Sequence, residues 1–389
     1  MTGLAGCGSS GSSGFPSDRL APRPAITAPL SSSATSSTSS TQPVISCPSV
    51  VDIGQWSNGR LAAQMLAIST EMATIADVSQ AVSGGVGGVV LAGTSSSPDL
   101  KTEIANMQQL DKGGVRQLFM TDEEGGGIQG LSGLVGSMPW PRSMAGSMTT
   151  AQVESLTFKV GQAMRSLGVT MDLAPVVDLD AGPGPSKTNP DGSRSFSADP
   201  SVAVKYAQAY MTGLAKAGVI SVLKHFPGLG GASGNTDFTP AHTLQYAQLI
   251  KTGLVPFEKL APGARAVMIS NASIPGLTDG VPASLSAKAI AVLRNVVGFK
   301  GLIISDSLET VSIASYQPDL GKAVVDAAVA GVDMIMLASS NPNQVPSYLA
   351  AKQALSQAIA SGVFPRSSAE ASVGKILLLK GYDSSCIYF

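Results

Sequence analysis

The stretch V-I-S-V-L-K-H-F-P-G-L-G-G-A-S-G-N-T-D, residues 219–237, begins as an apolar run rich in β-branched residues and turns polar at Lys224 and His225. Such a run is typical of a β-strand, and the glycines after it indicate a loop. The loop ends at the carboxylate of Asp237. A strand ending in a cation and an imidazole, followed by a loop that carries a carboxylate, suits a sugar or phosphate site and is hard to explain by packing alone.

The run at 219–224 is one of eight short apolar runs, and segments with helical spacing lie between them. The runs are nearly continuous rather than alternating, which is typical of parallel strands buried on both faces. Eight such strands alternating with helices predict a single-domain (β/α)8 barrel. A doubly wound open sheet is the alternative, and no G-x-G-x-x-G follows the first run to support its nucleotide-binding form. The predicted strands are 64–69, 88–91, 117–121, 170–177, 219–224, 265–271, 301–305 and 333–337. The predicted helices are 99–112, 150–167, 201–216, 245–260, 286–297, 318–331 and 345–361.

The composition restricts the class of protein. Hydrophobic residues make up 44% of the 389 residues and charged residues 13%, so a large core is available and the composition argues against disorder of the main body. The formal net charge is -1 and basic runs are few, which argues against nucleic acid as a partner. No apolar run reaches the roughly 18–20 residues that a membrane-spanning helix needs.

The first 46 residues differ from the rest. Residues 8–46 are mostly Ser, Thr, Gly, Pro and Ala, a composition that predicts a flexible tether. Leu4-Ala5-Gly6-Cys7 resembles the lipobox of a bacterial lipoprotein, with Cys7 as the lipidated residue and 1–7 as the remnant of a truncated signal. The folded catalytic domain is then 47–389. We expect an extracytoplasmic protein, secreted or held at the membrane only through a lipid on Cys7.

The other two cysteines are Cys47 and Cys386, one at each end of the predicted domain. In an exported protein they could form a disulfide that ties the two ends together, and two unpaired thiols are the alternative.

Polar residues follow five of the predicted strands. In a (β/α)8 barrel the carboxyl ends of all strands open on one face, so these side chains are expected to converge in one pocket. Each of them singly could cap the next helix, but five polar strand ends favour a shared site. Two carboxylates at one pocket are the minimum for glycoside hydrolysis, and Asp306 is the strongest candidate because it directly follows an apolar strand. The residues concerned are Asp122, Glu123, Glu124, Asp172, Asp178, Lys224, His225, Ser270, Asn271, Ser305 and Asp306.

Eight short motifs follow one another along the chain. They are G-V-G-G-V-V-L at 85–91, D-E-E-G-G-G-I-Q at 122–129, L-A-P-V-V-D at 173–178, R-S-F-S-A-D-P at 194–200, K-H-F-P-G-L-G at 224–230, P-A-S-L-S at 282–286, S-D-S-L at 305–308 and A-G-V-D-M at 330–334. Each motif alone is weak, whereas the ordered set is specific and spans about 60–382. In this order the motifs resemble glycoside hydrolase family 3, in particular its single-domain bacterial β-N-acetylglucosaminidases.

The resemblance implies a retaining enzyme that removes terminal β-linked N-acetylglucosamine from cell-wall sugars, as a monomer, without metal or cofactor. Asp306 matches the nucleophile that forms a covalent glycosyl-enzyme. Four residues match positions that bind hydroxyls of the terminal sugar. Taken alone, His225 could be a core histidine and Lys224 a strand-end residue reaching water; within the motif, the site is favoured. The four residues are Asp122, Arg194, Lys224 and His225.

The chain departs from the family pattern at two places. The D-S-H triplet, whose His is the general acid/base, falls on Asn235-Thr236-Asp237. Asp237 could serve as a carboxylic acid/base instead, and His242 is the alternative. The two arginines expected after D-x-E-G-G are Gly127 and Gly130, a change that bears on sugar specificity. A family 3 glycosidase of shifted specificity and a non-catalytic carbohydrate-binding lipoprotein therefore remain as alternatives, and the retained Asp306 weighs against the second.

Overall fold

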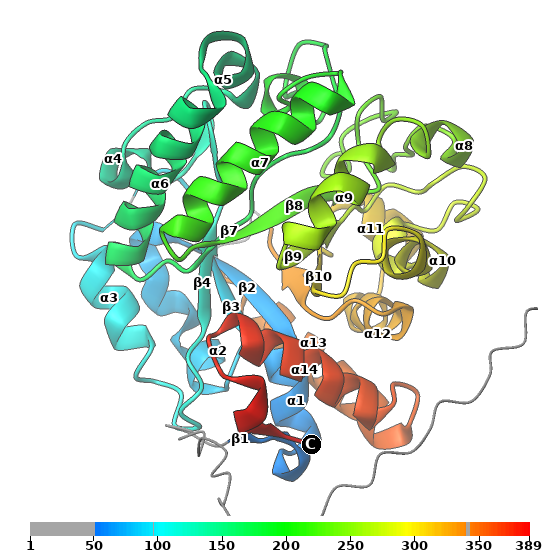
Figure 1. Ribbon diagram of the computed structural model, residues 1–389. Helices are drawn as coiled ribbons and strands as arrows, with labels where there is room; N and C mark the ends of the chain where they lie inside the picture. Colours follow the sequence, from blue (N-terminus) through cyan, green and yellow to red (C-terminus); the bar gives the residue numbers. More distant parts are fainter. Residues whose placement is uncertain (1–50, 96, 340–342) are drawn as a thin grey trace, which may run out of the picture. The chain divides into compact units, whose positions relative to one another are not determined.

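The computed structural model describes residues 51–95, 97–339 and 343–389 (Figure 1). Within these residues eight parallel strands form one sheet in the order β10-β9-β8-β7-β4-β3-β2-β11, so strands that follow one another along the chain are neighbours. The first and last strands of this order are joined as well, since the Ser305 amide donates to the Met334 carbonyl at 2.9 Å and Ile304 and Met334 form a parallel bridge. The predicted (β/α)8 barrel is confirmed, and the open sheet is wrong.

All eight predicted strands are present, with one much shorter than expected. The strands are β2 (Leu66–Glu71), β3 (Gly88–Ala92), β4 (Leu118–Thr121), β7 (Met171–Asp172), β8 (Ile220–Phe226), β9 (Ala266–Ile269), β10 (Leu302–Ser305) and β11 (Ile335–Leu337). The run predicted at 170–177 has regular pairing only in β7, because Pro175 has no amide to donate. Beyond it the chain still follows β8 through single bonds, such as Val177 N to Lys224 O at 2.8 Å.

The longest predicted helices are confirmed. The segment 150–167 is α6 (Thr150–Leu167), which begins with a reciprocal capping box between Thr149 and Gln152 and ends at Gly168, whose φ of 97° suits glycine. The other helices around the barrel that were predicted are α3 (Leu100–Met107), α7 (Pro200–Lys216), α12 (Leu320–Ala330) and α13 (Val345–Ser361). Of these, α3 is shorter than the predicted 99–112, because it ends at Met107.

Two predicted helices need correction. The segment 245–260 forms two short helices, α8 (Tyr246–Leu249) and α9 (Leu254–Leu260). The turn between them brings Gly253 against Gly228, where a side chain on Gly228 would meet the Gly253 Cα at 3.0 Å. The segment 286–297 is α10 (Ala287–Ala291) followed by a π-helical turn (Val292–Val296). In both segments the apolar spacing is helical, and in 245–260 the close packing of Gly253 against Gly228 interrupts the regular α-helix.

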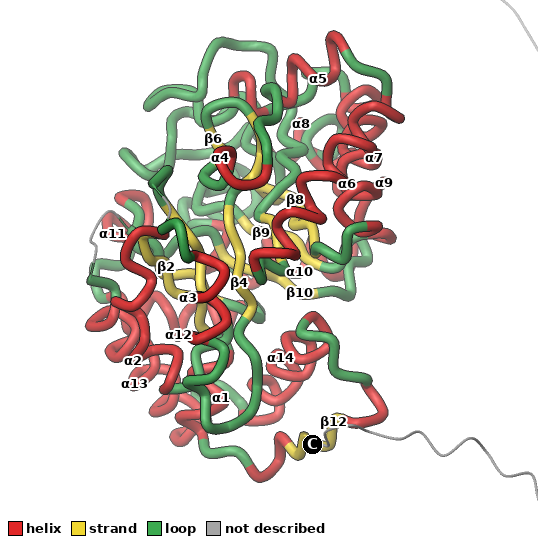
Figure 2. Tube along the Cα trace, turned by 90° about the vertical axis from the view of Figure 1, so that its left-hand side faces the viewer, coloured by secondary structure: helices red, strands yellow, loops and turns green. Residues whose placement is uncertain are grey.

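The long segments that follow the strands gather at one end of the barrel. After β4 the chain forms the hairpin of β5 (Glu123–Gly125) and β6 (Ile128–Gln129) and the short helices α4 (Ser132–Val135) and α5 (Pro141–Ser147). Figure 2 shows α4, α5 and α8 with many loops at this end of the strands. The carboxyl ends of the strands therefore lie under a thick layer of loops, which is where barrel enzymes carry their sites.

The opposite end of the barrel holds the two ends of the described chain. β1 (Val51–Asp52) and β12 (Ile387–Tyr388) pair in parallel, next to α1 (Asn58–Gln64) and α14 (Arg366–Leu379). The Arg366 guanidinium donates to the carbonyls of Gly54 at 3.0 Å and Trp56 at 2.8 Å. The segments 1–7 and 8–46, Cys7 and Cys47 lie outside the described residues. Among the helices described, none is both long and apolar enough to cross a membrane.

Candidate active site

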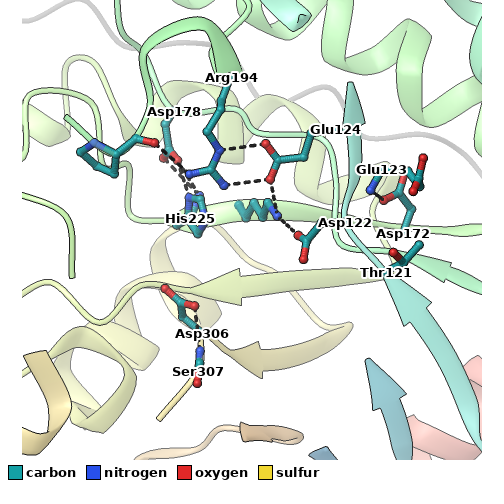
Figure 3. Close-up of polar contacts among 12 residues, drawn as sticks. Thr121, Asp122, Glu123, Glu124, Asp172, Asp178, Arg194, His225, Asp306 and Ser307 are labelled. Atoms are coloured by element: carbon teal, nitrogen blue, oxygen red, sulfur yellow. Dashed lines mark hydrogen bonds and ion pairs between the residues drawn. The ribbon is translucent and has the colours of Figure 1, made fainter. Parts of the chain in front are cut away.

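Lys224 joins two carboxylates at the carboxyl end of β8. Asp122 and Glu124 lie two residues apart around the start of β5, so their side chains fall on the same side of an extended chain. The Lys224 Nζ lies 2.5 Å from Asp122 Oδ1 and 2.6 Å from Glu124 Oε1 (Figure 3). Lys224 is buried, whereas Asp122 is partly exposed. Asp122 is therefore the end of this ion-pair group that a ligand can reach.

Arg194 completes the group from the other side. It lies in a 3-10 turn (Gly192–Arg194) of the loop after β7. Its Nε and Nη2 each donate to one carboxylate oxygen of Glu124 at 2.8 Å. Its Nη1 also donates to the carbonyl of Pro190 at 2.9 Å. Burial alone would raise the pKa of Glu124, but the charges of Arg194 and Lys224 hold that pKa well below its ordinary value. The group thus contains two anions and two cations, with Glu124 at its centre.

Asp178 fixes the ring of His225. Its Oδ2 lies 2.7 Å from His225 Nδ1, and its carboxylate also accepts from the amides of His225 and of Leu229 at 2.8–3.1 Å. Since Nδ1 is engaged with Asp178, Nε2 is the ring nitrogen available to a ligand. The same carboxylate also holds the start of the loop after β8, so ring and loop are positioned together.

A third carboxylate, Asp191, lies beside this pair. One ligand atom each from Asp178, Asp191 and His225 lies within 4.8 Å of the others, and neither oxygen of the buried Asp191 is hydrogen-bonded to another described residue. Burial and the charge of Asp178 raise the pKa of Asp191 well above its ordinary value. Two ligands of a tetrahedral zinc ion, each at about 2.0 Å, are roughly 3.3 Å apart, so the 2.7 Å His225–Asp178 bond would have to open to admit a metal. The described geometry therefore does not fit a tetrahedral zinc ion held by both Asp178 Oδ2 and His225 Nδ1.

Asp306 follows β10 directly. Its amide donates to the carbonyl of Ile269 at 2.9 Å, and its Oδ1 accepts from the amide of Ser307 at 2.7 Å. Figure 3 shows it on a separate strand end, apart from the row formed by Asp178, His225 and Arg194, with Ser307 as its partner among the residues drawn. The side chain is half-buried. One carboxylate oxygen is thus held by the backbone, and the group keeps access to a ligand.

The loop after β8 brings Asp237 to the same place. The residue is exposed, but partial burial of its carboxyl and the charge of Asp306 raise the pKa of Asp237 to about 6, against the opposing charges of His225 and Arg194. Asp237 therefore lies within electrostatic range of Asp306, His225 and Arg194. His242 lies further along the loop, where its Nδ1 is 3.0 Å from the carbonyl of Thr243 and its amide donates to Ser233.

Residues 61–379 match the family described as "Glycosyl hydrolase family 3 N terminal domain". The chain belongs to glycosyl hydrolase family 3. It is 35% identical over 310 residues to "Beta-hexosaminidase LpqI" of Mycobacterium tuberculosis, covering 77% of each chain. The solved structure of M. tuberculosis LpqI superposes with a TM-score of 0.77 at 33% identity, over 87% of this chain and 99% of that one. A β-N-acetylhexosaminidase from Beutenbergia cavernae superposes with a TM-score of 0.76 at 26% identity, over 84% and 99%. The protein is therefore a family 3 glycosidase.

The structure explains why this family 3 chain has glycine where the family pattern has arginine. The indole of Trp140 lies over Gly126 and Gly127, and a side chain starting at Gly127 would meet the ring at 3.0 Å. A side chain at Gly130 would meet the carbonyl oxygen of Gly93 at 2.6 Å. Trp140 and the loop between β3 and α3, which contains Gly93, therefore occupy the space into which arginine side chains at positions 127 and 130 would extend.

Some residues predicted to converge in the pocket do not belong to it. Tyr210 donates to Asp172 Oδ2 at 3.1 Å and to the Glu123 carbonyl at 2.5 Å, and Asp172 accepts from the Glu123 amide at 3.0 Å. Burial raises the pKa of Glu123 to about 8 and that of Asp172 to about 7. Asn271 donates to the Ser307 carbonyl at 2.6 Å, and Ser270 Oγ accepts from the Ala272 amide. These side chains hold the loops in place, so their assignment to the pocket was wrong.

Glu124 was among the residues predicted to converge in the pocket, but the sequence assigned it no role of its own. The D-E-E-G run contained it, and its spacing of two from Asp122 was the available signal. Its two cationic partners come from β8 and from the loop after β7, so their meeting point is a property of the folded barrel.

Replacing Glu124 by glutamine should lower the free energy of unfolding by about 3 kcal/mol, because two buried cations lose their shared anion. The measurement is urea unfolding at neutral pH. The matched control is Glu154→Gln, which removes the exposed ion pair with Lys216 and should cost about 1 kcal/mol or less. Equal losses in the two variants would contradict the central place given to Glu124.

Proposed function

We propose that the protein is a retaining β-N-acetylhexosaminidase that removes terminal N-acetylglucosamine, with Asp306 as nucleophile and Asp237 as general acid/base. The observation that carries the proposal is that Asp306, held directly after β10 by the Ser307 amide, lies within electrostatic range of Asp237 on the loop after β8. Burial and the charge of Asp306 raise the pKa of Asp237 to about 6. Two carboxyl groups that interact in one site, one of them with a raised pKa, are what hydrolysis with retention requires. The β-hexosaminidase names of the relatives support the sugar.

The ion-pair group beside them suits the hydroxyls of the terminal sugar. Asp122 offers a partly exposed carboxylate that can accept hydrogen bonds, and Lys224 and Arg194 offer donors held at fixed positions by Glu124. His225 adds Nε2 from a ring fixed by Asp178. Because these charges are already paired, a neutral sugar meets a rigid set of donors and acceptors that need little reorganisation.

The reaction then proceeds in two displacements. Asp306 attacks the anomeric carbon while protonated Asp237 gives its proton to the departing glycosidic oxygen, which leaves as an alcohol. Once Asp306 is an ester its charge is gone, and the pKa of Asp237 should fall because one of the causes of its rise has been removed. The ionised Asp237 is then suited to take a proton from water, whose oxygen attacks the anomeric carbon and releases Asp306.

The test is hydrolysis of an aryl β-N-acetylglucosaminide. Proton NMR identifies which anomer of N-acetylglucosamine is released first. Release of the β-anomer and a covalent Asp306 adduct with a slow fluorinated substrate are expected. Release of the α-anomer would show inversion and overturn the assignment of Asp306. Sugar binding without hydrolysis would favour a non-catalytic carbohydrate-binding protein.

A glycosidase of shifted specificity is the second candidate, and the replacement of the expected arginines by Gly127 and Gly130 favours it. Aryl β-glucoside, β-N-acetylgalactosaminide and β-N-acetylglucosaminide should be compared at equal enzyme concentration. A kcat/KM that is highest for the N-acetylglucosaminide supports the first proposal, and a higher value for either of the others supports the second.

We further propose an extracytoplasmic protein, secreted or lipid-anchored at Cys7. One relative, 31% identical over 67% of this chain and 76% of its own length, is described as an "Uncharacterized secreted glycosyl hydrolase" from Arthroderma benhamiae. Export would allow a Cys47–Cys386 disulfide. The pairing of Val51 with Ile387 supports that bond, since Cys47 is four residues from Val51 and Cys386 adjoins Ile387.

Replacing either Cys47 or Cys386 by serine should lower the free energy of unfolding by about 2–4 kcal/mol in the oxidised protein. The double variant should lose the same amount, because both changes remove one bond. Thermal unfolding with and without reductant measures this, and mass spectrometry of an unreduced digest should contain the linked peptides. Losses that add in the double variant would contradict the disulfide.

A further inference from the structure

A cavity of about 490 Å³ lies at the base of the barrel. Residues that line it come just before β4, β7, β8 and β9 or just after α6 and α14. In a (β/α)8 barrel the amino ends of the strands face the base, whereas Asp122, Lys224 and Asp306 lie at or beyond the carboxyl ends of their strands. The cavity is therefore separate from the candidate active site.

The lining of this cavity is rich in positive charge. Five of its lining residues carry a cation, and none of the described residues that line it is Asp or Glu. None of these cations forms an ion pair with another described residue. Like charges that gather without carboxylates repel one another, so the described part of the chain leaves the cavity positive. The five residues are Lys101, Arg116, Arg165, Arg265 and Lys380.

The ends of helices account for only part of this charge. Arg165 lies in the last turn of α6 and Lys380 directly follows α14, where a cation is favoured by the negative end of the helix dipole. Lys101 lies instead in the first turn of α3, where a cation is unfavourable. Arg116 and Arg265 precede β4 and β9 and belong to no helix. Helix dipoles therefore leave three of the five cations unexplained.

Two of the cations are held in position by neutral groups. Arg265 Nη2 donates to the carbonyl of Leu378 at 2.8 Å, and Lys380 Nζ donates to Oε1 of the buried Gln64 at 2.7 Å. Burial lowers the pKa of Lys380 to about 7, and the charge of Asp111, which does not line the cavity, opposes this only in part. Because these cations are fixed in place and lack an ion-pair partner among the described residues, an anion that enters the cavity can bind them without competition.

We propose that this cavity binds a phosphorylated small molecule that carries more than one negative charge. Three of the five cations are arginines, whose planar guanidinium group can donate two parallel hydrogen bonds to phosphate oxygens. The buried side chains of Ile104, Leu118 and Ile220 also line the cavity and suit the carbon part of such a ligand. The volume is that of an ordinary ligand pocket. A free phosphate ester and the headgroup of an anionic lipid share this chemistry.

The test is calorimetric titration of the full chain with pyrophosphate at low salt. We expect saturable binding with a Kd below about 1 mM that weakens as the salt concentration rises. The double variant Arg116→Gln/Arg165→Gln should weaken the binding about tenfold or more, because charge-assisted contacts are lost. Both side chains are exposed and neither is hydrogen-bonded to another described residue, so circular dichroism should show an unchanged fold.

The matched control is Lys159→Gln/Lys251→Gln. It removes two exposed cations that do not line the cavity, so the Kd for pyrophosphate should stay as in the wild type. An equal Kd in the wild type and in the arginine double variant would overturn the proposal, as would equal losses in the two double variants. Displacement of pyrophosphate by N-acetylglucosamine would place the anion at the mouth of the barrel and would also overturn it.

Vesicles distinguish the two sources of the phosphate. Cosedimentation with phosphatidylcholine vesicles that contain phosphatidic acid, whose headgroup is a phosphate monoester, is compared with vesicles of phosphatidylcholine alone. Retention that requires phosphatidic acid and is lost in Arg116→Gln/Arg165→Gln identifies a lipid headgroup as the ligand. Pyrophosphate binding without retention on vesicles identifies a free phosphate ester. A protein that binds neither pyrophosphate nor these vesicles contradicts the proposed site.

Discussion

Asp306→Ala is expected to lower kcat for an aryl β-N-acetylglucosaminide by about 10⁴-fold or more, the size of loss seen when a covalent nucleophile is removed from other hydrolases. No other described carboxylate is held in the same way at the end of β10, with its oxygen bonded to the Ser307 amide. Steady-state rates with a chromogenic substrate measure the change. Circular dichroism should show an unchanged fold, because the side chain is half-buried and its removal opens no core cavity.

Azide provides the control for the role of Asp306. A small anion can enter the space left by the carboxylate and attack the anomeric carbon, so it should restore part of the rate and give an α-glycosyl azide. Asp326→Ala removes a carboxylate from a surface ion pair with Lys322 and should keep full activity. A fully active Asp306→Ala enzyme would refute the nucleophile assignment.

Asp237→Ala should have the second largest effect, a loss of about 10²–10⁴-fold in kcat/KM for substrates with poor leaving groups. The loss should be much smaller for a dinitrophenyl leaving group, which needs no proton. His242→Ala should leave both substrates nearly unaffected, because the described hydrogen bonds of His242 are to Thr243 and Ser233. If His242→Ala rather than Asp237→Ala shows the leaving-group dependence, the acid/base assignment is wrong.

The pH dependence should follow the same carboxyl. A general acid acts in its protonated form, so kcat/KM for a poor leaving group should fall as the pH rises through about 6, the raised pKa of Asp237. In Asp306→Asn the negative charge is absent, so a carboxyl probe such as NMR should find the pKa of Asp237 lower than in the wild type. An alkaline limb that persists unchanged in Asp237→Ala would contradict this origin.

The barrel could be predicted from the sequence because buried parallel strands have a pattern of their own. The run at 219–224 and its seven counterparts are continuous apolar stretches, and each became a strand of the sheet. The strand predicted at 170–177 was too long, because Pro175 interrupts the regular pairing after β7 without changing the apolar pattern of the sequence. The helix predicted at 245–260 was divided because the approach of Gly253 to Gly228 is a tertiary contact, which no local periodicity reports.

The site was less predictable for a related reason. A polar side chain at a strand end can belong to the ion-pair group of the site, as Lys224 does, or can hold a loop, as Asn271 does. Both kinds of residue follow an apolar run, so the sequence pattern does not distinguish them. The choice between Asp237 and His242 depends on the path of a loop whose shape is set by contacts with 186–187 and Ser312. The central role of Glu124 could not be predicted, because its two partners come from distant segments.

The pairing of β1 with β12 has a consequence for how the enzyme meets its substrate. That pair lies at the end of the barrel away from α4, α5 and α8 (Figure 2). Val51, the first residue of the described domain, therefore lies at the base of the barrel, and the mouth formed by the loops after the strands is at the other end. A glycan can bring its terminal sugar to that mouth without touching β1 or β12.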